Sequence, residues 1–182
     1  MRVPVYKPLI DPTDLQAVSN VLNERWLGQG KYVKQFEEEI VSRLGNSKRR
    51  VVTVSNGSSG IHLALILAGV GYGEEVIVSS LIFGGVGQAS LATGAKPIFC
   101  DEENATLVAG LENIERVLSP KTRVIIALDY ASNQCNLDEI LLYAGKKGLR
   151  VIHDAAHSFG WENKGRVTGS FGDITVFSFD PV

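Results

Sequence analysis

The first part of the chain has apolar residues that recur every three to four positions, which is the spacing of one helix face. Leu15, Val18 and Leu22 share such a face, and Thr13 stands where a capping residue is expected. The pattern therefore predicts a helix that begins at Asp14.

A second stretch, from Tyr32 to Leu44, has the same helical spacing and is followed by Gly45, a residue type that commonly ends helices. From residue 51 onward the pattern changes to short apolar runs that barely alternate with polar residues, as expected of strands buried on both faces. The runs are Val51–Val54, Val76–Val78, Pro97–Phe99, Val124–Leu128, Val151–Ile152 and Ile174–Phe177.

Helical patterns separate the first five of these runs. They are Ser58–Ala68, Gly85–Thr93, Leu111–Leu118 and Leu137–Lys146. Alternation of strands and helices needs crossover connections, which place the strands parallel. The sequence therefore predicts an α/β protein, a doubly wound three-layer α/β/α sandwich with a mostly parallel sheet. Ligands of such sheets bind at the carboxyl ends of the strands.

Composition limits the function classes. The 182 residues are 45% apolar, which supports a real core, and the net charge of -2 comes from acids and bases mixed along the chain. This balance gives no reason to expect nucleic acid or a membrane surface as a partner. Without a signal-peptide pattern or a long apolar stretch, we expect a soluble, cytoplasmic protein. Cys100 and Cys135 are isolated, so we expect reduced packing residues rather than a disulfide.

Three predicted strand ends carry candidate chemistry. At the first, Gly57 and Ser58 open a predicted helix after a strand. The free N–H groups and positive helix end would hold a phosphate, with the Ser58 hydroxyl adding a hydrogen bond. The alternative is an ordinary serine-capped helix.

The second candidate follows the run Val76–Val78. Gly85 and Gly87 resemble part of a dinucleotide fingerprint, but the turn is long and Ser90 replaces the third glycine. A helix start with Phe83 held over the strand ends is the preferred interpretation, because its ring could stack there on a flat ligand. A phenylalanine in the core is the other possibility.

The third candidate is Asp154, at the end of a predicted buried strand. A buried carboxylate is costly unless it is paired, and a protonated pyridine nitrogen would pair it. His157 could bond a phenolic oxygen or pack over the ring, whereas a capping role for Asp154 is the alternative. A metal site of His153, Asp154 and His157 is disfavoured, since the first two point to opposite sides of a strand.

Other polar residues have weaker signals. Asp129 and Tyr130 end a predicted strand and could line the same cleft. Glu102 and Glu103 are interpreted as solvated loop charges, and His62 as a packing residue in an apolar helix.

Taken together, the motifs resemble the DegT/DnrJ/EryC1/StrS family of fold-type-I, pyridoxal-phosphate (PLP) aminotransferases of nucleotide sugars. The resemblance covers essentially the whole chain. It rests on the order and spacing of the segments 26–33, 36–37, 55–58, 62–65, 73–78, 94–97, 129–131, 136–140, 154–157, 169–173 and 177–179.

The resemblance implies a role for each matching residue. Gly57 and Ser58 would hold the PLP phosphate, with a further hydroxyl from Ser178, and Phe83 would stack on the ring. Asp154 would bond the ring nitrogen and keep it protonated. His157 would lie near the phenolic oxygen. These residues are the expected cofactor-binding set.

The family reaction moves an amino group, commonly from glutamate, to a keto-deoxysugar carried on a nucleotide, for polysaccharide or glycoside synthesis. The family's Schiff-base lysine follows the motif Phe177-Ser178-Phe179 shortly, and its expected position lies just past Val182. No catalytic residue is therefore assigned. The sequence departs from the family's usual residues at Asn133-Gln134, Ser80–Phe83 and Asp180, so the resemblance does not identify the sugar.

By the same resemblance, residues 1–50 would form an N-terminal helical segment and residues 51–182 an incomplete PLP-binding large domain, without the C-terminal small domain. The full-length form would be a homodimer. Two alternatives remain: a non-catalytic remnant or split half that binds PLP weakly or not at all, and a nucleotide-binding α/β module that uses Gly85 and Gly87.

Overall fold

The computed structural model describes residues 8–131 and 133–180. Contacts divide the chain into two compact units, one within residues 1–53 and 180–182 and the other covering Val54–Phe179. The larger unit contains the sheet.

The smaller unit contains helix α1 (Pro12–Glu24), which begins two residues earlier than the sequence pattern predicts. The carboxylate of Asp11 caps it by accepting hydrogen bonds from the N–H groups of Thr13, at 2.6 Å, and Asp14, at 3.4 Å. Asp14 completes the capping box by accepting from the Asp11 N–H at 2.8 Å. Because Asp11 caps the helix, the predicted role of Thr13 is wrong, and Pro12 takes the first position, where its lack of an N–H costs nothing.

Helix α2 (Lys31–Leu44) ends as predicted at Gly45, whose φ of 62° lies in the left-handed region. The strand predicted at Val51–Val54 does not form, because no strand pairing includes these residues. Within the same unit, the carboxylate of Glu37 accepts hydrogen bonds from the Thr53 N–H at 2.8 Å and from its hydroxyl at 2.9 Å. A side chain of α2 therefore takes the place of a neighbouring strand as hydrogen-bond partner.

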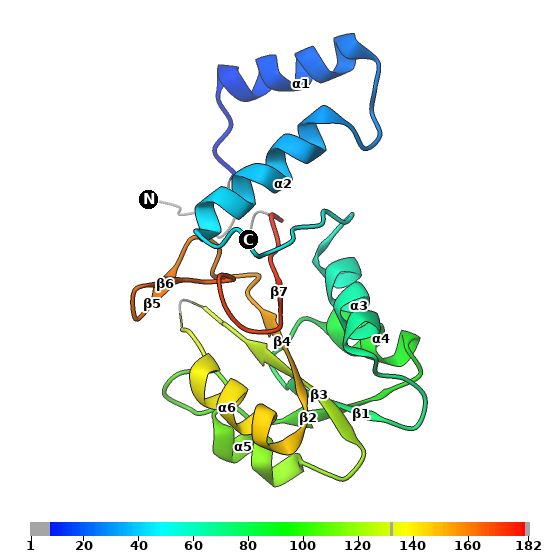
Figure 1. Cartoon of the computed structure of the whole chain (residues 1–182), viewed down its shortest axis with the longest axis vertical. Helices are drawn as coiled ribbons and strands as arrows, with labels where there is room; N and C mark the ends of the chain where they lie inside the picture. Colours follow the sequence, from blue (N-terminus) through cyan, green and yellow to red (C-terminus); the bar gives the residue numbers. More distant parts are fainter. Residues whose placement is uncertain (1–7, 132, 181–182) are drawn as a thin grey trace, which may run out of the picture. The chain divides into compact units, whose positions relative to one another are not determined.

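The larger unit has a five-stranded sheet in the order β2-β1-β3-β4-β7, and all its strand pairs are parallel (Figure 1). The strands are β1 (Glu75–Ser79), β2 (Lys96–Cys100), β3 (Thr122–Leu128), β4 (Arg150–Asp154) and β7 (Ile174–Val176). The register pairs Leu128 with Asp154 and Asp154 with Val176, so three strands end at one edge.

Helices α3 (Gly57–Ala68) and α4 (Gly84–Ala92) cover one face of this sheet, and α5 (Leu111–Val117) and α6 (Leu137–Lys147) the other (Figure 1). The central strand β3 is buried on both faces, which is why apolar and polar residues do not alternate along it. Val124 belongs to the apolar cluster under α3 and α4, whereas its neighbour Ile125 belongs to the cluster under α5 and α6, and both are fully buried. The predicted three-layer sandwich is confirmed.

A short hairpin of β5 (Glu162–Asn163) and β6 (Arg166–Val167) was not predicted. Its two-residue turn, Lys164-Gly165, has positive φ at both positions, 51° and 74°, which suits the twist of a tight hairpin. Lys164 lies at the tip, with its Nζ 3.4 Å from a carboxylate oxygen of Asp138.

Within residues 8–131 and 133–180, no helix combines the length and the apolar character that crossing a membrane would require.

Candidate functional site

The start of α3 lies where a phosphate site was predicted. The side chain of Asn56, not a serine, caps the helix by accepting from the Ser59 N–H at 2.8 Å. Gly57 and Ser58 are the first two helical residues, and within the described part of the chain their N–H groups donate no hydrogen bond. A helix of 12 residues thus presents two free donors at its positive end.

Ser178 and Phe83 lie beside this helix end. A Cβ placed on Gly57 would lie 3.5 Å from the Cβ of Ser178, so the Ser178 side chain is directly against the start of α3. A Cβ on Gly85 would lie only 2.5 Å from the Ser58 hydroxyl and 2.8 Å from the Phe83 ring. Any side chain at position 85 would therefore displace both groups.

Phe83 immediately precedes α4, and its side chain is 75% exposed. It is not the core residue of the alternative interpretation. With Ser58 and His62 it lines a concave region of about 580 Å³ between α3 and α4. His62 is therefore a wall residue of this concavity, not a core packing residue. Gly85 and Gly87 lie inside α4, so they form no separate phosphate-binding turn.

Asp154 is the last residue of β4 and is 6% exposed. Its carboxylate accepts one hydrogen bond, from the Ala156 N–H at 3.2 Å. Burial raises the pKa of this carboxyl above its ordinary value, although that hydrogen bond and the nearby His153 and His157 act in the opposite direction. A carboxylate in this position gains strongly from a cationic partner, such as a protonated ring nitrogen.

His157 follows Asp154 on the loop after β4 and is exposed. Its Nδ1 accepts a hydrogen bond from the Ala131 N–H at 3.4 Å, and its ring centroid is 5.5 Å from that of Tyr130. The structure thus joins the loops after β3 and β4 at the edge where Asp154 lies. His157 is free at this exposed end to meet a ligand oxygen.

Asp129 does not line this cleft, contrary to one sequence-based expectation. Its side chain is 1% exposed and accepts hydrogen bonds from the Cys135 N–H at 2.9 Å and the Ser158 hydroxyl at 2.6 Å. Although burial opposes ionisation, its interactions with His153, Ser158 and the Cys135 N–H outweigh that effect and hold the Asp129 pKa below its ordinary value.

Sequence reasoning missed the role of Glu102, which is partly buried and not a solvated loop charge. Its carboxylate accepts hydrogen bonds from the hydroxyls of Ser79 and Ser80 and from the Leu81 N–H. The turn that leads to Phe83 is therefore tied to the end of β2. The usable signal was the pair of serines at the end of the neighbouring strand.

The six predicted cofactor residues fall into two groups in the larger unit. The first group lies at the start of α3 and consists of Gly57, Ser58, Phe83 and Ser178. In the second group, Asp154 ends β4 and His157 lies in the loop that follows it. Strand β7 connects them, since Val176 pairs with Asp154 and its side chain lies against Gly60 of α3.

Residues 8–182 match the model of the DegT/DnrJ/EryC1/StrS aminotransferase family. The chain belongs to this family. This DegT-family chain is 35% identical to a GDP-perosamine synthase of Escherichia coli O157:H7, over 97% of its own length and 48% of that protein.

Solved structures agree with the family match. The aminotransferase TlmJ from Streptoalloteichus hindustanus superposes with a TM-score of 0.93 at 34% identity, covering all of this chain and 50% of TlmJ. NtdA from Bacillus subtilis, solved with the bound cofactor PMP, superposes with a TM-score of 0.84 at 29% identity, covering 92% of this chain and 37% of NtdA. The fold is thus that of the fold-type-I aminotransferases, and this chain spans about half the length of the curated relatives it matches.

Proposed function

We propose that this chain forms the PLP-binding part of an aminotransferase that transfers an amino group, with glutamate as donor, to a nucleotide-linked keto-deoxysugar. The observation that carries the proposal is Asp154, a buried carboxylate with one hydrogen bond, at the carboxyl edge of a DegT-family sheet. Such sugars enter polysaccharides or glycosides. Because the relatives are about twice as long, the whole reaction is proposed for a protein that also supplies their remaining half.

Each residue of the site has a task in this proposal. The N–H groups of Gly57 and Ser58 and the hydroxyl of Ser178 bind the phosphate, and Phe83 covers one face of the ring. Asp154 holds a proton at the ring nitrogen, and His157 orients the phenolic oxygen. When bound, PLP supplies an electron sink that stabilises negative charge next to the reacting nitrogen.

The proposed cofactor site is tested by titrating PLP into the protein and following the circular dichroism induced in the cofactor band. We expect saturable 1:1 binding. Asp154→Ala removes the partner of the ring nitrogen, and Gly85→Ala displaces Ser58 and Phe83. Each substitution should weaken binding at least about ten-fold, which corresponds to roughly 1.4 kcal/mol.

Glu112→Ala, an exposed change on α5, is the matched control and should leave PLP affinity unchanged. Absence of an induced signal, or an equal loss of affinity in the control, would contradict the assignment.

Reduction with borohydride tests whether any lysine within these 182 residues forms a Schiff base with PLP. No lysine follows Phe177-Ser178-Phe179 in the sequence, and Lys164 contacts Asp138, so the 182 residues should give no stoichiometric pyridoxyl-lysine. A specific adduct would contradict this expectation and show that a lysine within these 182 residues forms the Schiff base with PLP.

A further inference from the structure

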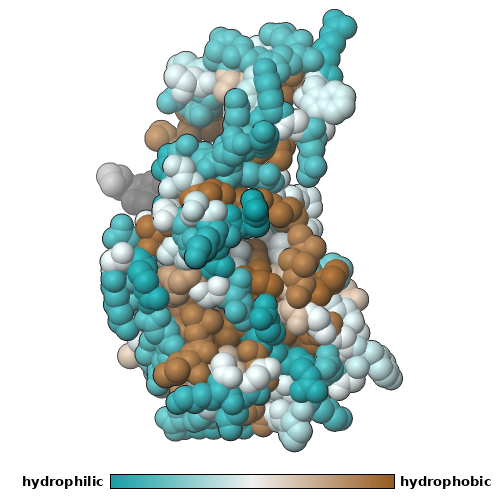
Figure 2. Space-filling model, in the orientation of Figure 1, coloured by the Kyte–Doolittle hydropathy of each residue, from teal (hydrophilic) through white to brown (hydrophobic). Residues whose placement is uncertain are grey.

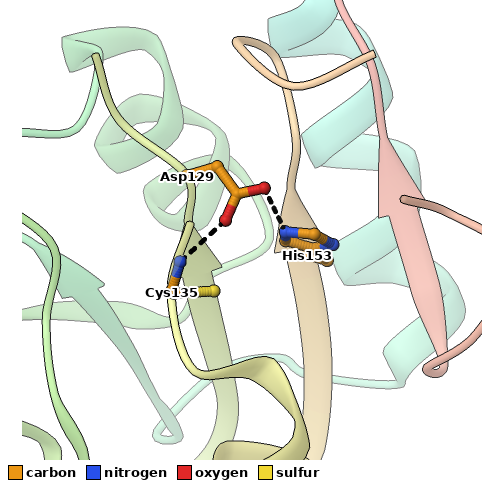
Figure 3. A group of neighbouring side chains, drawn as sticks. All are labelled: Asp129, Cys135 and His153. Carbon is orange, nitrogen blue, oxygen red and sulfur yellow. Dashed lines mark hydrogen bonds and ion pairs between the residues drawn. The ribbon is translucent and has the colours of Figure 1, made fainter. Parts of the chain in front are cut away.

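Three buried side chains near the carboxyl ends of β3 and β4 bring an oxygen, a sulfur and a nitrogen ligand atom close together. Asp129 follows β3, Cys135 precedes α6 and His153 lies in β4. Their side chains are 1%, 2% and 4% exposed, and one carboxylate oxygen, the sulfur and one ring nitrogen all lie within 4.8 Å of one another. Figure 3 shows Asp129 and Cys135 both facing His153.

His153 is the unusual member of this group. Its Nε2 lies 2.9 Å from Oδ2 of Asp129, but neither ring nitrogen makes a hydrogen bond within the part of the chain that the structure describes. Buried polar atoms are normally paired, because an unpaired group loses its hydration without compensation. Nε2 thus meets the carboxylate as an ion pair without an aligned hydrogen bond, and Nδ1 has no hydrogen-bond partner among the described residues. One ring nitrogen of the neutral imidazole therefore keeps a lone pair for a cation.

The carboxylate is also held in a fixed orientation. The N–H of Cys135 donates to Oδ1 at 2.9 Å and the Ser158 hydroxyl donates to Oδ2 at 2.6 Å. Hydrogen bonds of this type commonly orient metal ligands. Beside the three side chains lies a cavity of about 10 Å³, also lined by Gln134 and Thr168, which is near the lower limit for one water molecule.

We propose that Asp129, Cys135 and His153 bind a divalent zinc ion, with a water molecule from the adjacent cavity as fourth ligand. Sulfur, imidazole and carboxylate together suit Zn²⁺, whereas Mg²⁺ and Ca²⁺ prefer oxygen alone. A thiolate, a carboxylate and a neutral imidazole cancel the charge of the ion, so the filled site is neutral and compatible with full burial.

The ligand atoms must close around the ion. Zinc–ligand bonds of about 2.0 to 2.3 Å place neighbouring ligands roughly 3.3 to 3.7 Å apart. The group already lies within 4.8 Å. Small side-chain rotations of Cys135 and His153 would widen the 2.9 Å approach of Nε2 to Oδ2 of Asp129 and close the longer gaps. Binding releases the thiol proton of Cys135 to solvent. The ion would then tie the carboxyl ends of β3 and β4 to the segment before α6.

This zinc site is separate from the proposed PLP site, since it contains neither Asp154 nor His157. The zinc proposal therefore does not depend on the proposed PLP site. Its function would be structural, because the ion joins three segments and the cluster is shielded from solvent.

The test uses the purified protein after chelator treatment. Zinc content by mass spectrometry should return to one ion per chain after incubation with Zn²⁺ and removal of excess. Titration with Co²⁺ should give a thiolate-to-metal absorption band. Cys135→Ser should lose this band and bind Zn²⁺ at least about ten-fold more weakly, and His153→Gln should also lose stoichiometric binding.

Cys100→Ser is the matched control, because Cys100 is also a buried free cysteine but lies at the end of β2. It should retain the band and the zinc content. Wild-type protein without the Co²⁺ band or without stoichiometric zinc would overturn the proposal and leave a hydrogen-bonded cluster only. Loss of the band in Cys100→Ser, with Cys135→Ser unaffected, would overturn it as well. The wild-type measurements decide the question even if a variant fails to fold.

Discussion

At the scale of single residues, Glu102 organises the turn before Phe83. Its carboxylate accepts hydrogen bonds from the Ser80 hydroxyl at 2.8 Å and the Leu81 N–H at 3.0 Å, and another from the Ser79 hydroxyl. Burial opposes its ionisation, but these hydrogen bonds outweigh that effect and hold the Glu102 pKa below its ordinary value. The charged form is therefore the one that stabilises the turn.

Replacing Glu102 by alanine should lower the free energy of unfolding by about 1 to 3 kcal/mol at pH 7, because the buried Ser79 hydroxyl loses its acceptor. The sign of the pH dependence follows from the lowered pKa. The stabilisation is present above the unfolded-state pKa and is lost as pH falls through the folded-state pKa. Urea unfolding at several pH values measures both effects. Glu103→Ala, the exposed neighbour, is the control, and an equal loss there would refute a specific role for Glu102.

Asp154 is expected to reduce stability when no ligand pairs it. Because burial raises its pKa, Asp154→Asn should increase the free energy of unfolding at pH 7 by roughly 1 kcal/mol, the usual size of a single substitution, and weaken PLP binding. The gain should shrink as pH falls through the raised folded-state pKa and vanish below the unfolded-state pKa of about 3.9, where the carboxyl is protonated in both states. Thermal unfolding with chelator present measures the gain. A less stable variant at pH 7 would contradict the expectation.

At the scale of elements, the contact between α3 and β7 depends on one glycine. A Cβ on Gly60 would lie 2.9 Å from Cγ1 of Val176, which leaves no room for a methyl group. Gly145 in α6 is the matched control, because nothing lies within 4 Å of its Cβ position. Gly60→Ala should cost about 1 to 3 kcal/mol, whereas Gly145→Ala should gain about 0.5 to 1 kcal/mol. Denaturant unfolding of both variants measures the difference, and equal effects would show that α3 adjusts freely.

The elements also show what the sequence could reveal. The five strands of the main sheet and helices α2 to α6 are predicted from the sequence because their apolar patterns are set by burial on one or both faces of a layer. The run Val51–Val54 has the same composition, but Glu37 supplies its partner from a helix 16 residues away from Thr53. The zinc ligands were missed for a similar reason. Residues 129, 135 and 153 have no metal-binding spacing, and only the pairing of β3 with β4 brings the first and last together.

The expected cofactor residues, in contrast, were recognised from the sequence alone. Short motifs placed each of them at a strand end or a helix start, and the parallel sheet gathers such ends at one edge. Motifs do not show packing, however. The closeness of Gly85 to Ser58 and Phe83, and the position of Asp129 away from the cleft, depend on side-chain contacts between segments distant in sequence.

At the scale of the whole molecule, the larger unit exposes apolar side chains on α3. Ile66 is 55% exposed and Leu67 67% exposed, and Figure 2 shows hydrophobic surface over this helix. Neighbouring α4 adds Leu91, which is 62% exposed. Contiguous apolar surface of this kind usually marks an interface. We propose that this face contacts a second copy in a protein that also supplies the remaining half of its relatives, because the family resemblance implies a homodimer for that full-length form only.

In that full-length form, the double substitution Ile66→Lys, Leu67→Lys should weaken self-association at least about ten-fold, because charges in an apolar interface lose hydration without gaining partners. Sedimentation velocity over a concentration series measures the association constant. Leu142→Lys is the matched control, since Leu142 is 64% exposed but lies on α6, on the opposite face of the sheet. The control should associate like the wild type. A wild-type protein that stays monomeric at every concentration, or a control that dissociates as readily as the double variant, would show that the α3 face does not make the contact.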